Sequence, residues 1–333
     1  MIEIELAHAD LARLRFAHSP IRELVASLRT LQDPARRQMY RQWLSSVRGQ
    51  LGGLDMALLT ALAPSGRFMP DFVLPNPAGL HGVLGDELDE VAATPPEHVG
   101  AELDLVYPQG SMPAALRGLY EDPAAQLPAV VAQLHAYWRV AVQPVWPRLE
   151  ALCMADVGYR MQRFAHGGIA RVLDGLHQEI SLVGDRLRID KPHHCLHRVD
   201  LDGSGVILVP CAFSWPTLMV SCCGTFQPLL SYPPRGVAQL WEAPADRLDP
   251  LADLIGKTRA TLLAALGLPR TTTQLAGQLG ISPSTVSQHL KILNHAALVD
   301  AQRRGRIVLY QRTAAATALL AATRRDTSAK RIG

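Results

Sequence analysis

The segment SPSTVSQHLK (residues 282–291) combines hydroxyl, amide, imidazole and ammonium side chains with no carboxylate. Hydroxyl and amide groups hydrogen-bond to base edges and phosphate oxygens, whereas acids would repel a phosphate backbone. A helix with this outer face can enter a major groove closely. The alternative interpretation is an ordinary solvated helix face, but such a face usually carries Glu as often as Lys. The residue types therefore favour contact with a nucleic acid.

Local signals predict the helix that presents these side chains. Ser282 is a suitable N-cap and Pro283 fits the first helical position, so we expect a helix from there to about Ala297. Its apolar residues at i, i+4 and i+7 must face a core: Val286, Leu290 and Leu293. The outer face then carries the candidate DNA-contacting residues, with the histidine near its edge: Ser284, Thr285, Ser287, Gln288, His289 and Lys291.

The neighbouring segments complete a winged helix-turn-helix over residues 254–325. LIGKTRATLLAALG (254–267) predicts an amphipathic helix that ends at Gly267, and TTTQLAGQLG (271–280) predicts a second helix capped by Thr271 or Thr272. ALVDAQRRGRIVLYQRT (297–313) predicts two strands around a turn at Arg304–Gly305. The basic tip of such a wing can reach phosphates or the minor groove. These segments add further candidate DNA contacts: Thr272, Thr273, Ser282, Arg303, Arg304 and Arg306.

Positive charge is concentrated at the carboxyl end of the chain. Residues 257–333 contain twelve Lys and Arg against two acids, a net charge of +10, whereas the whole chain carries only +3. The preceding residues therefore carry −7, from 21 basic and 28 acidic residues. A basic module on an acidic body is typical of a protein with a polyanionic partner.

The segment TVSQHLKILNHAALVDAQRRGRIVLYQRT resembles the recognition helix and wing of ArsR-type transcriptional regulators. The shared pattern is Ser-x-His-Leu-x-x-Leu, then Leu-Val, then an Arg-Gly-Arg wing that ends in Tyr. It is carried by Ser287, His289, Leu290, Leu293, Leu298, Val299, Arg304, Gly305, Arg306 and Tyr310. Ala297 departs from the pattern, because Gly is commoner there, and we expect it to tighten the turn without changing the fold.

The rest of the chain resembles a long bacterial subset of these regulators with a large amino-terminal domain of poorly understood role. Segments such as RLRFAHSPIRELVASLRTL and GVILVPCAFSWP carry this resemblance. We expect this domain to span residues 1–245, with a helical part at 20–183, a strand-rich part at 185–240, and an opening strand at IEIEL. DGSG (202–205) reads as a hairpin turn between two strands, and a Pro/Asp-rich linker follows at 242–254. The predicted fold class is α+β, with helices and antiparallel strands ahead of a winged helix-turn-helix.

Two groups of side chains could bind a metal or act as a redox switch. The places where ArsR-type proteins hold metals lack a ligand set here. The segment HHCLH (193–197) could instead chelate zinc or a haem iron through His193, Cys195 and His197, although on a straight strand its ends lie roughly 13 Å apart. The simpler interpretation is an inward-facing strand. Cys222 and Cys223 could switch by oxidation, but buried thiols are usually inert.

These features predict a sequence-specific, homodimeric transcriptional regulator, and the resemblance to ArsR-type proteins implies a repressor relieved by a small-molecule effector in the amino-terminal domain. The predicted partners are double-stranded DNA with a pseudo-palindromic operator and a second copy of the chain. No cofactor is predicted, no motif of an enzyme is recognised, and the chain opens without a signal peptide, which favours the cytoplasm and no membrane association. A metal- or haem-responsive regulator, or an enzymatic amino-terminal domain, is the alternative.

Overall fold

A computed structural model describes residues 1–66, 68–108, 110–191, 198–222, 227–241, 251–267, 269–279, 281–304 and 307–320. The chain divides into two compact units, Met1–Trp241 and Glu242–Gly333. Within the described residues, no helix combines the length and apolar character needed to cross a bilayer.

The amino-terminal unit is mainly helical. Its α-helices are α1 (His8–Arg13), α2 (Pro20–Gln32), α3 (Arg41–Val47), α4 (Met56–Leu62), α5 (Leu84–Ala92), α6 (Pro96–Val106), α7 (Arg117–Glu121), α8 (Pro123–Tyr137), α9 (Trp146–Leu173) and α10 (Val237–Leu240). Short 3₁₀ turns join several of them, at Pro34–Arg36, Arg48–Gly53, Asp71–Val73, Ala114–Leu116 and Ala212–Ser214. A π-helical turn, Trp138–Val142, follows α8. The long helix α9 leaves helical geometry at Gly167 and Gly168, with φ of 66° at Gly168, and is kinked there.

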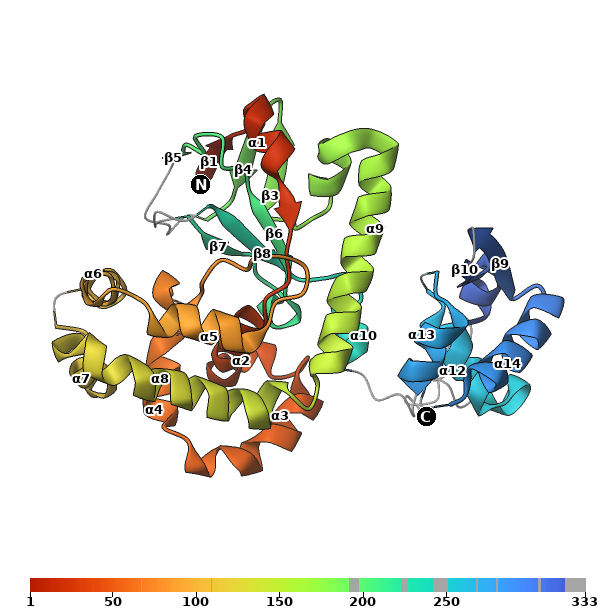
Figure 1. The fold of residues 1–333 in the computed structure, drawn as a ribbon, viewed down its shortest axis with the longest axis horizontal. Helices are drawn as coiled ribbons and strands as arrows, with labels where there is room; N and C mark the ends of the chain where they lie inside the picture. The colour runs from red at the N-terminus through yellow and green to blue at the C-terminus, as the bar shows by residue number, and fades with distance from the viewer. Residues whose placement is uncertain are drawn as a thin grey trace, which may run out of the picture. The chain divides into compact units, whose positions relative to one another are not determined.

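Two four-stranded sheets complete this unit. The first has the order β3-β4-β1-β5 and the second the order β2-β6-β8-β7. In Figure 1 their strands gather at one end of the unit and α2 to α8 at the other, with α9 running alongside. The strands are β1 (Ile2–Glu5), β2 (Arg15–Phe16), β3 (Ile180–Val183), β4 (Arg186–Ile189), β5 (Arg198–Val199), β6 (Ile207–Pro210), β7 (Met219–Ser221) and β8 (Leu229–Tyr232).

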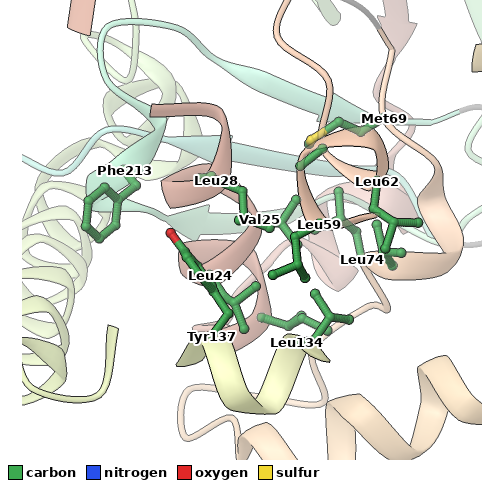
Figure 2. Packing of buried hydrophobic residues seen from close by; sticks show 14 of the residues in the cluster. Leu24, Val25, Leu28, Leu59, Leu62, Met69, Leu74, Leu134, Tyr137 and Phe213 are labelled. Carbon is green, nitrogen blue, oxygen red and sulfur yellow. The ribbon is translucent and has the colours of Figure 1, made fainter. Parts of the chain in front are cut away.

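Helix α2 occupies the centre of the helical core. Figure 2 shows Leu24, Val25 and Leu28 of α2 packed among side chains from α4, α8 and the segment around Met69 and Leu74. The sequence IRELVASLRTL reads as a one-faced amphipathic helix, yet its charged residues Arg22 and Glu23 are also fully buried. The other elements surround α2 on every side, so its polar side chains hydrogen-bond within the protein.

The fold class is confirmed, with corrections to its details. The opening strand IEIEL forms β1, which pairs antiparallel with β4 and parallel with β5. The hairpin predicted at residues 202–205 is wrong: Asp202 and Gly203 make a turn with positive φ, but β5 and β6 lie in different sheets. Both strands instead find parallel partners that are distant in sequence. Strand β3 also lies within the range predicted as helical, because a turn at Gly184, with φ of 65°, pairs it with β4.

The carboxyl-terminal unit has its own core. It contains α12 (Lys257–Ala265), α13 (Thr272–Leu279), α14 (Pro283–His295), and the antiparallel pair β9 (Val299–Arg304) and β10 (Ile307–Arg312); residues 314–320 are again helical. The helix predicted over residues 254–267 is divided, because Gly256 has φ of 86° and separates a helical segment at 251–255 from α12, which begins at Lys257. Of the linker predicted at 242–254, residues 251–254 are helical, and the rest lies outside the described residues.

A buried carboxylate caps the amino terminus of α2. Oε2 of Glu87, on α5, accepts a hydrogen bond from the Ile21 amide at 2.8 Å, while Oε1 is buried with no partner among the described residues. Burial raises the pKa of Glu87 to about 7, and the Ile21 amide only partly opposes this shift. The folded state therefore binds a proton more tightly than the unfolded state does.

We predict that Glu87→Gln makes the protein more stable than the wild type at about pH 8 and nearly equal to it at about pH 4. At low pH the wild-type carboxyl is protonated and resembles the amide. As the pH rises from the ordinary glutamate pKa of 4.5 to the folded-state pKa of about 7, only the wild type loses stability. The expected gap at high pH is about 3 kcal/mol in the free energy of unfolding, measured by denaturant titration. Asp89→Asn on the exposed side of α5 is the control. A gap that does not change with pH would contradict the raised pKa.

Candidate nucleic-acid interface

The amino terminus of α14 gathers three hydroxyl groups. Ser282 is the N-cap and accepts a hydrogen bond from the Thr285 amide at 3.2 Å. Its Oγ also lies 2.7 Å from Oγ of Ser284 and 2.8 Å from Oγ1 of Thr285. The first turn of a helix carries partial positive charge and free amide donors, so this end attracts phosphate oxygens. The N-cap and the Pro283 position are as the sequence predicts.

Three apolar side chains fix which face of α14 points outward. Val286, Leu290 and Leu293 are buried, which confirms the inward face predicted from their spacing. They belong to the same apolar cluster as Leu263 of α12 and Leu275 of α13. Because this cluster holds one side of α14, the opposite side is free to meet a partner.

The residues of α13 and α14 that are predicted to contact DNA divide into an exposed group and a partly buried group. The partly buried His289 has its Nδ1 shielded from solvent, without a hydrogen-bond partner in the described parts of the chain. The exposed group is Thr273, Ser282, Ser284, Gln288 and Lys291, and the partly buried group is Thr272, Thr285, Ser287 and His289.

Helix α13 is positioned by a reciprocal cap. The Thr271 amide donates to Oε1 of Gln274 at 3.0 Å, and the Gln274 amide donates to Oγ1 of Thr271 at 3.2 Å. This pair is a capping box, so Thr271 is the capping residue of the two that the sequence allowed. Thr272 and Thr273 then form the first turn of α13.

The wing is tied to the helices by contacts that sequence reasoning missed. Arg270, just before α13, exchanges two backbone hydrogen bonds with Tyr310 of β10, at 2.9 and 2.8 Å. Nδ2 of Asn294 donates to the Val299 carbonyl at 2.7 Å and links the end of α14 to β9. Neither contact has a local sequence signal, because each depends on how the strands pair.

The tip of the wing differs in detail from the prediction. Arg304 is the last residue of β9 and pairs with Ile307 of β10, so it lies in a strand and not in the turn predicted at Arg304–Gly305. Arg303, opposite Val308, is exposed. Gly305 and Arg306 lie outside the described residues, so the contact predicted for Arg306 stays a prediction.

The turn after α14 is made by a residue with a left-handed backbone. Ala297 has φ of 54°. Its amide donates to the Asn294 carbonyl, and the Leu298 amide donates to the Leu293 carbonyl, both at 2.9 Å. This is the helix ending that usually places Gly at the left-handed position. The fold is kept despite Ala, as expected, but with backbone strain.

The electrostatics of this unit suit an anionic partner. Between Asp253 and Asp300 the sequence contains no Asp or Glu, and both helices of the helix-turn-helix fall within this interval. No carboxylate on these helices competes with phosphate for the helix termini or for Lys291.

The predicted metal and redox candidates fall mostly outside the described residues. His193, Cys195 and His197 all lie there, as does Cys223. Cys222 is buried, and burial raises the pKa of its thiol to about 12, which leaves it protonated and unreactive at neutral pH.

Two of the hollows lined by described residues of the amino-terminal unit could take a small molecule. One, of about 620 Å³, lies between β3 and the part of α9 that follows its kink, and includes Arg171, Asp174 and Ser181. The other, of about 250 Å³, is acidic and is lined by Asp71, Glu90, Glu102 and His98 beside Phe72.

Comparison with known proteins gives two family matches and three structures. A model of the bacterial regulatory proteins of the arsR family matches residues 257–301, and a model of a family of unknown function, DUF5937, matches residues 102–239. Reduced HlyU from Vibrio cholerae is 24% identical, with a TM-score of 0.21 over 24% of this chain and 87% of that one. Two mutant structures of Lactococcus lactis ZitR are also 24% identical, with TM-scores of 0.21 and 0.20, over 27% of this chain and 79% and 81% of theirs. No curated protein matches the chain.

We predict that Ala297→Gly stabilises the end of α14 by about 0.5–1 kcal/mol, because Gly adopts positive φ without the clash that Ala suffers but loses more freedom on folding. Hydrogen exchange of α14 peptides, followed by mass spectrometry, measures this as slower opening. The control is Ala296→Gly at the preceding position, where φ is −81° and Gly should destabilise. Equal effects of both variants would show that the left-handed backbone is not the cause.

Proposed function

We propose that the chain is a sequence-specific, homodimeric repressor of the ArsR type that releases DNA when its amino-terminal unit binds an effector. The match of its helix-turn-helix to the model of the bacterial arsR family supports this proposal. Such a protein acts on the chromosome, which would place it in the cytoplasm. The matched segment, residues 257–301, contains α12, α13, α14 and the start of the wing.

The observation that carries the proposal is the outer face of α14. It is held outward by Val286, Leu290 and Leu293, and it presents Ser284, Gln288 and Lys291 with no acid nearby in sequence. Gln288 has the amide that pairs in bidentate fashion with adenine, and the hydroxyls at the first turn suit phosphate oxygens. Arg303 on the wing would add a phosphate or minor-groove contact.

The dimer follows from the geometry of DNA. One α14 covers only a few base pairs, so a site long enough to be specific needs a second copy about 34 Å away along the duplex. Two-fold symmetry of the protein then requires a pseudo-palindromic operator. Sedimentation equilibrium without DNA tests this part separately, and a monomer at micromolar concentration would contradict it.

The effector is proposed to bind in the amino-terminal unit. The two hollows there differ in chemistry: the acidic one beside Phe72 suits a small cationic ligand, and the one beside the kink of α9 offers both Arg171 and Asp174. An effector changes DNA affinity only if it binds the DNA-competent and the released states differently.

Fluorescence anisotropy with DNA from upstream of the protein's own gene, compared with random DNA over a range of salt concentrations, tests the proposal. We expect a preference of about a thousandfold or more for the operator and a steep salt dependence. If no part of the upstream region binds more tightly than random DNA, the result would contradict the idea that this protein regulates its own gene in a sequence-specific way.

We predict that Gln288→Ala weakens binding to the operator by about 1–3 kcal/mol while leaving random DNA almost unchanged, because a base contact carries sequence information. The same anisotropy assay measures both affinities. Equal losses on the two DNAs would show that Gln288 does not read a base.

Lys291→Ala should instead weaken binding to all DNA and reduce the slope of log affinity against log salt by about one unit. The lost interaction is with a phosphate, which every sequence offers. Arg37→Ala, which removes one exposed positive charge from the amino-terminal unit, is the matched control and should leave the slope unchanged. If both variants change the slope equally, general charge and not a phosphate contact is responsible.

A further inference from the structure

Four side chains that could ligate a metal meet inside the amino-terminal unit. His18 precedes α2, Glu23 lies in the first turn of α2, Cys153 lies on α9, and Cys211 follows β6. One ligand atom each of His18, Glu23 and Cys153 lies within 4.8 Å of the others. All four residues have no solvent exposure. We refer to His18, Glu23, Cys153 and Cys211 as the buried cluster.

The imidazole of His18 lacks the partners that a buried polar ring needs. Both Nδ1 and Nε2 are buried, and neither has a hydrogen-bond partner in the described residues. Leaving a buried polar atom unsatisfied costs about 1–3 kcal/mol. The ring is held in place by stacking on Trp146, with centroids 4.8 Å apart and planes 14° apart. Burial, helped by His81, lowers the pKa of His18 to about 4, so the ring is neutral with a lone pair available.

The carboxylate of Glu23 is buried without a cation beside it. It accepts hydrogen bonds from the amides of Ala212 at 2.6 Å and Phe213 at 2.9 Å. The neighbouring guanidinium of Arg22 is directed to the Leu74 carbonyl and two serine hydroxyls. Among the described residues Glu23 forms no salt bridge, and burial raises its pKa. A divalent cation would supply the missing charge.

The two thiols lie on opposite oxygens of this carboxylate. Sγ of Cys153 donates to Oε1 at 3.6 Å and Sγ of Cys211 donates to Oε2 at 3.3 Å. Burial and the nearby Glu23 raise the pKa of both thiols, so both carry their protons in the metal-free protein. Metal binding requires the thiolate, which the charge of a bound cation stabilises.

We propose that His18, Glu23 and Cys153 bind a zinc-type divalent transition-metal ion, with Cys211 as the nearest thiol for the fourth position. One imidazole nitrogen, one carboxylate oxygen and one sulfur form a donor set that zinc accepts and that the oxygen-preferring ions Mg²⁺ and Ca²⁺ do not. Binding releases the Cys153 thiol proton to solvent, and a second proton leaves if Cys211 coordinates. The ion links α2, α9 and the end of β6.

Direct titration of the full-length protein with Zn²⁺, in competition with a chromophoric chelator, tests the site. We expect the wild type to bind the ion. His18→Phe and Cys153→Ser should each reduce the affinity for Zn²⁺ by more than about 100-fold, because removing even a residue that only supports a ligand lowers metal affinity about 10–100-fold. Co²⁺ in place of Zn²⁺ should give a thiolate-to-metal charge-transfer band in the wild type that Cys153→Ser abolishes.

His18→Phe separates metal binding from packing. Phe keeps the stacked ring on Trp146 and removes the two unpartnered nitrogens, so the metal-free variant should be as stable as the wild type or more stable. Zn²⁺ should raise the unfolding temperature of the wild type and not that of His18→Phe. If Cys153→Ser fails to fold, His18→Phe decides the question.

Two further variants locate the ion. Cys222→Ser changes a buried thiol outside the buried cluster and should leave binding intact. Cys195→Ser tests the segment 193–197 and should also leave this ion in place. The proposal is overturned if the wild type binds no Zn²⁺, if His18→Phe still binds it with wild-type affinity, or if Cys195→Ser removes it. None of these measurements involves DNA, so they are independent of the proposed regulatory function.

Discussion

The amino-terminal unit depends on two polar side chains, Arg22 and Glu23, that are fully buried at the start of α2 and hydrogen-bond in different directions. Glu23 holds the amides of Ala212 and Phe213, which fixes the chain where it leaves β6. Phe213 is thereby set among Tyr40, Trp43 and Trp241, with ring centroids 4.6–5.2 Å apart. Arg22 reaches in the other direction, to Ser221 of β7 and Ser231 of β8. A helix that places both residues in the interior joins the helical core to the second sheet through hydrogen bonds that an apolar helix could not make.

The carboxyl-terminal unit is the part whose structure the sequence predicts well, and the reason is that its signals are local. Ser282 and Pro283 mark the start of α14, and the spacing of Val286, Leu290 and Leu293 fixes its inner face within eight residues. The departures, at Gly256 and at the tip of the wing, concern single residues at element ends. Glycine backbone angles and strand register decide such ends, and neither is encoded in the apolar pattern.

The amino-terminal unit could be predicted only in outline, because its decisive contacts join distant segments. Strand β1 pairs with β4 and β5 across more than 180 residues, so no local signal distinguishes its parallel from its antiparallel neighbour. The turn at Asp202 and Gly203 has the residues of a hairpin, yet both flanking strands have better partners elsewhere. The buried cluster is the extreme case: Glu23 and Cys153 are 130 positions apart and belong to no motif. The sequence instead suggested a metal site at His193, Cys195 and His197, because these residues lie close together along the chain.

Burying polar groups is costly, and polar side chains of α14 and those of the buried cluster differ in whether they are exposed or buried. On α14 Ser284 and Gln288 are exposed, where water satisfies their hydroxyl and amide groups until DNA replaces it, so they cost the fold little. In the buried cluster, the imidazole of His18 has no water and no protein partner among the described residues, and Glu23 has no adjacent cation. An apolar side chain of similar shape at residue 18 would keep the stacking on Trp146 without the unsatisfied nitrogens. Packing alone therefore does not explain a histidine at this position, whereas a bound cation would satisfy the imidazole and the carboxylate together.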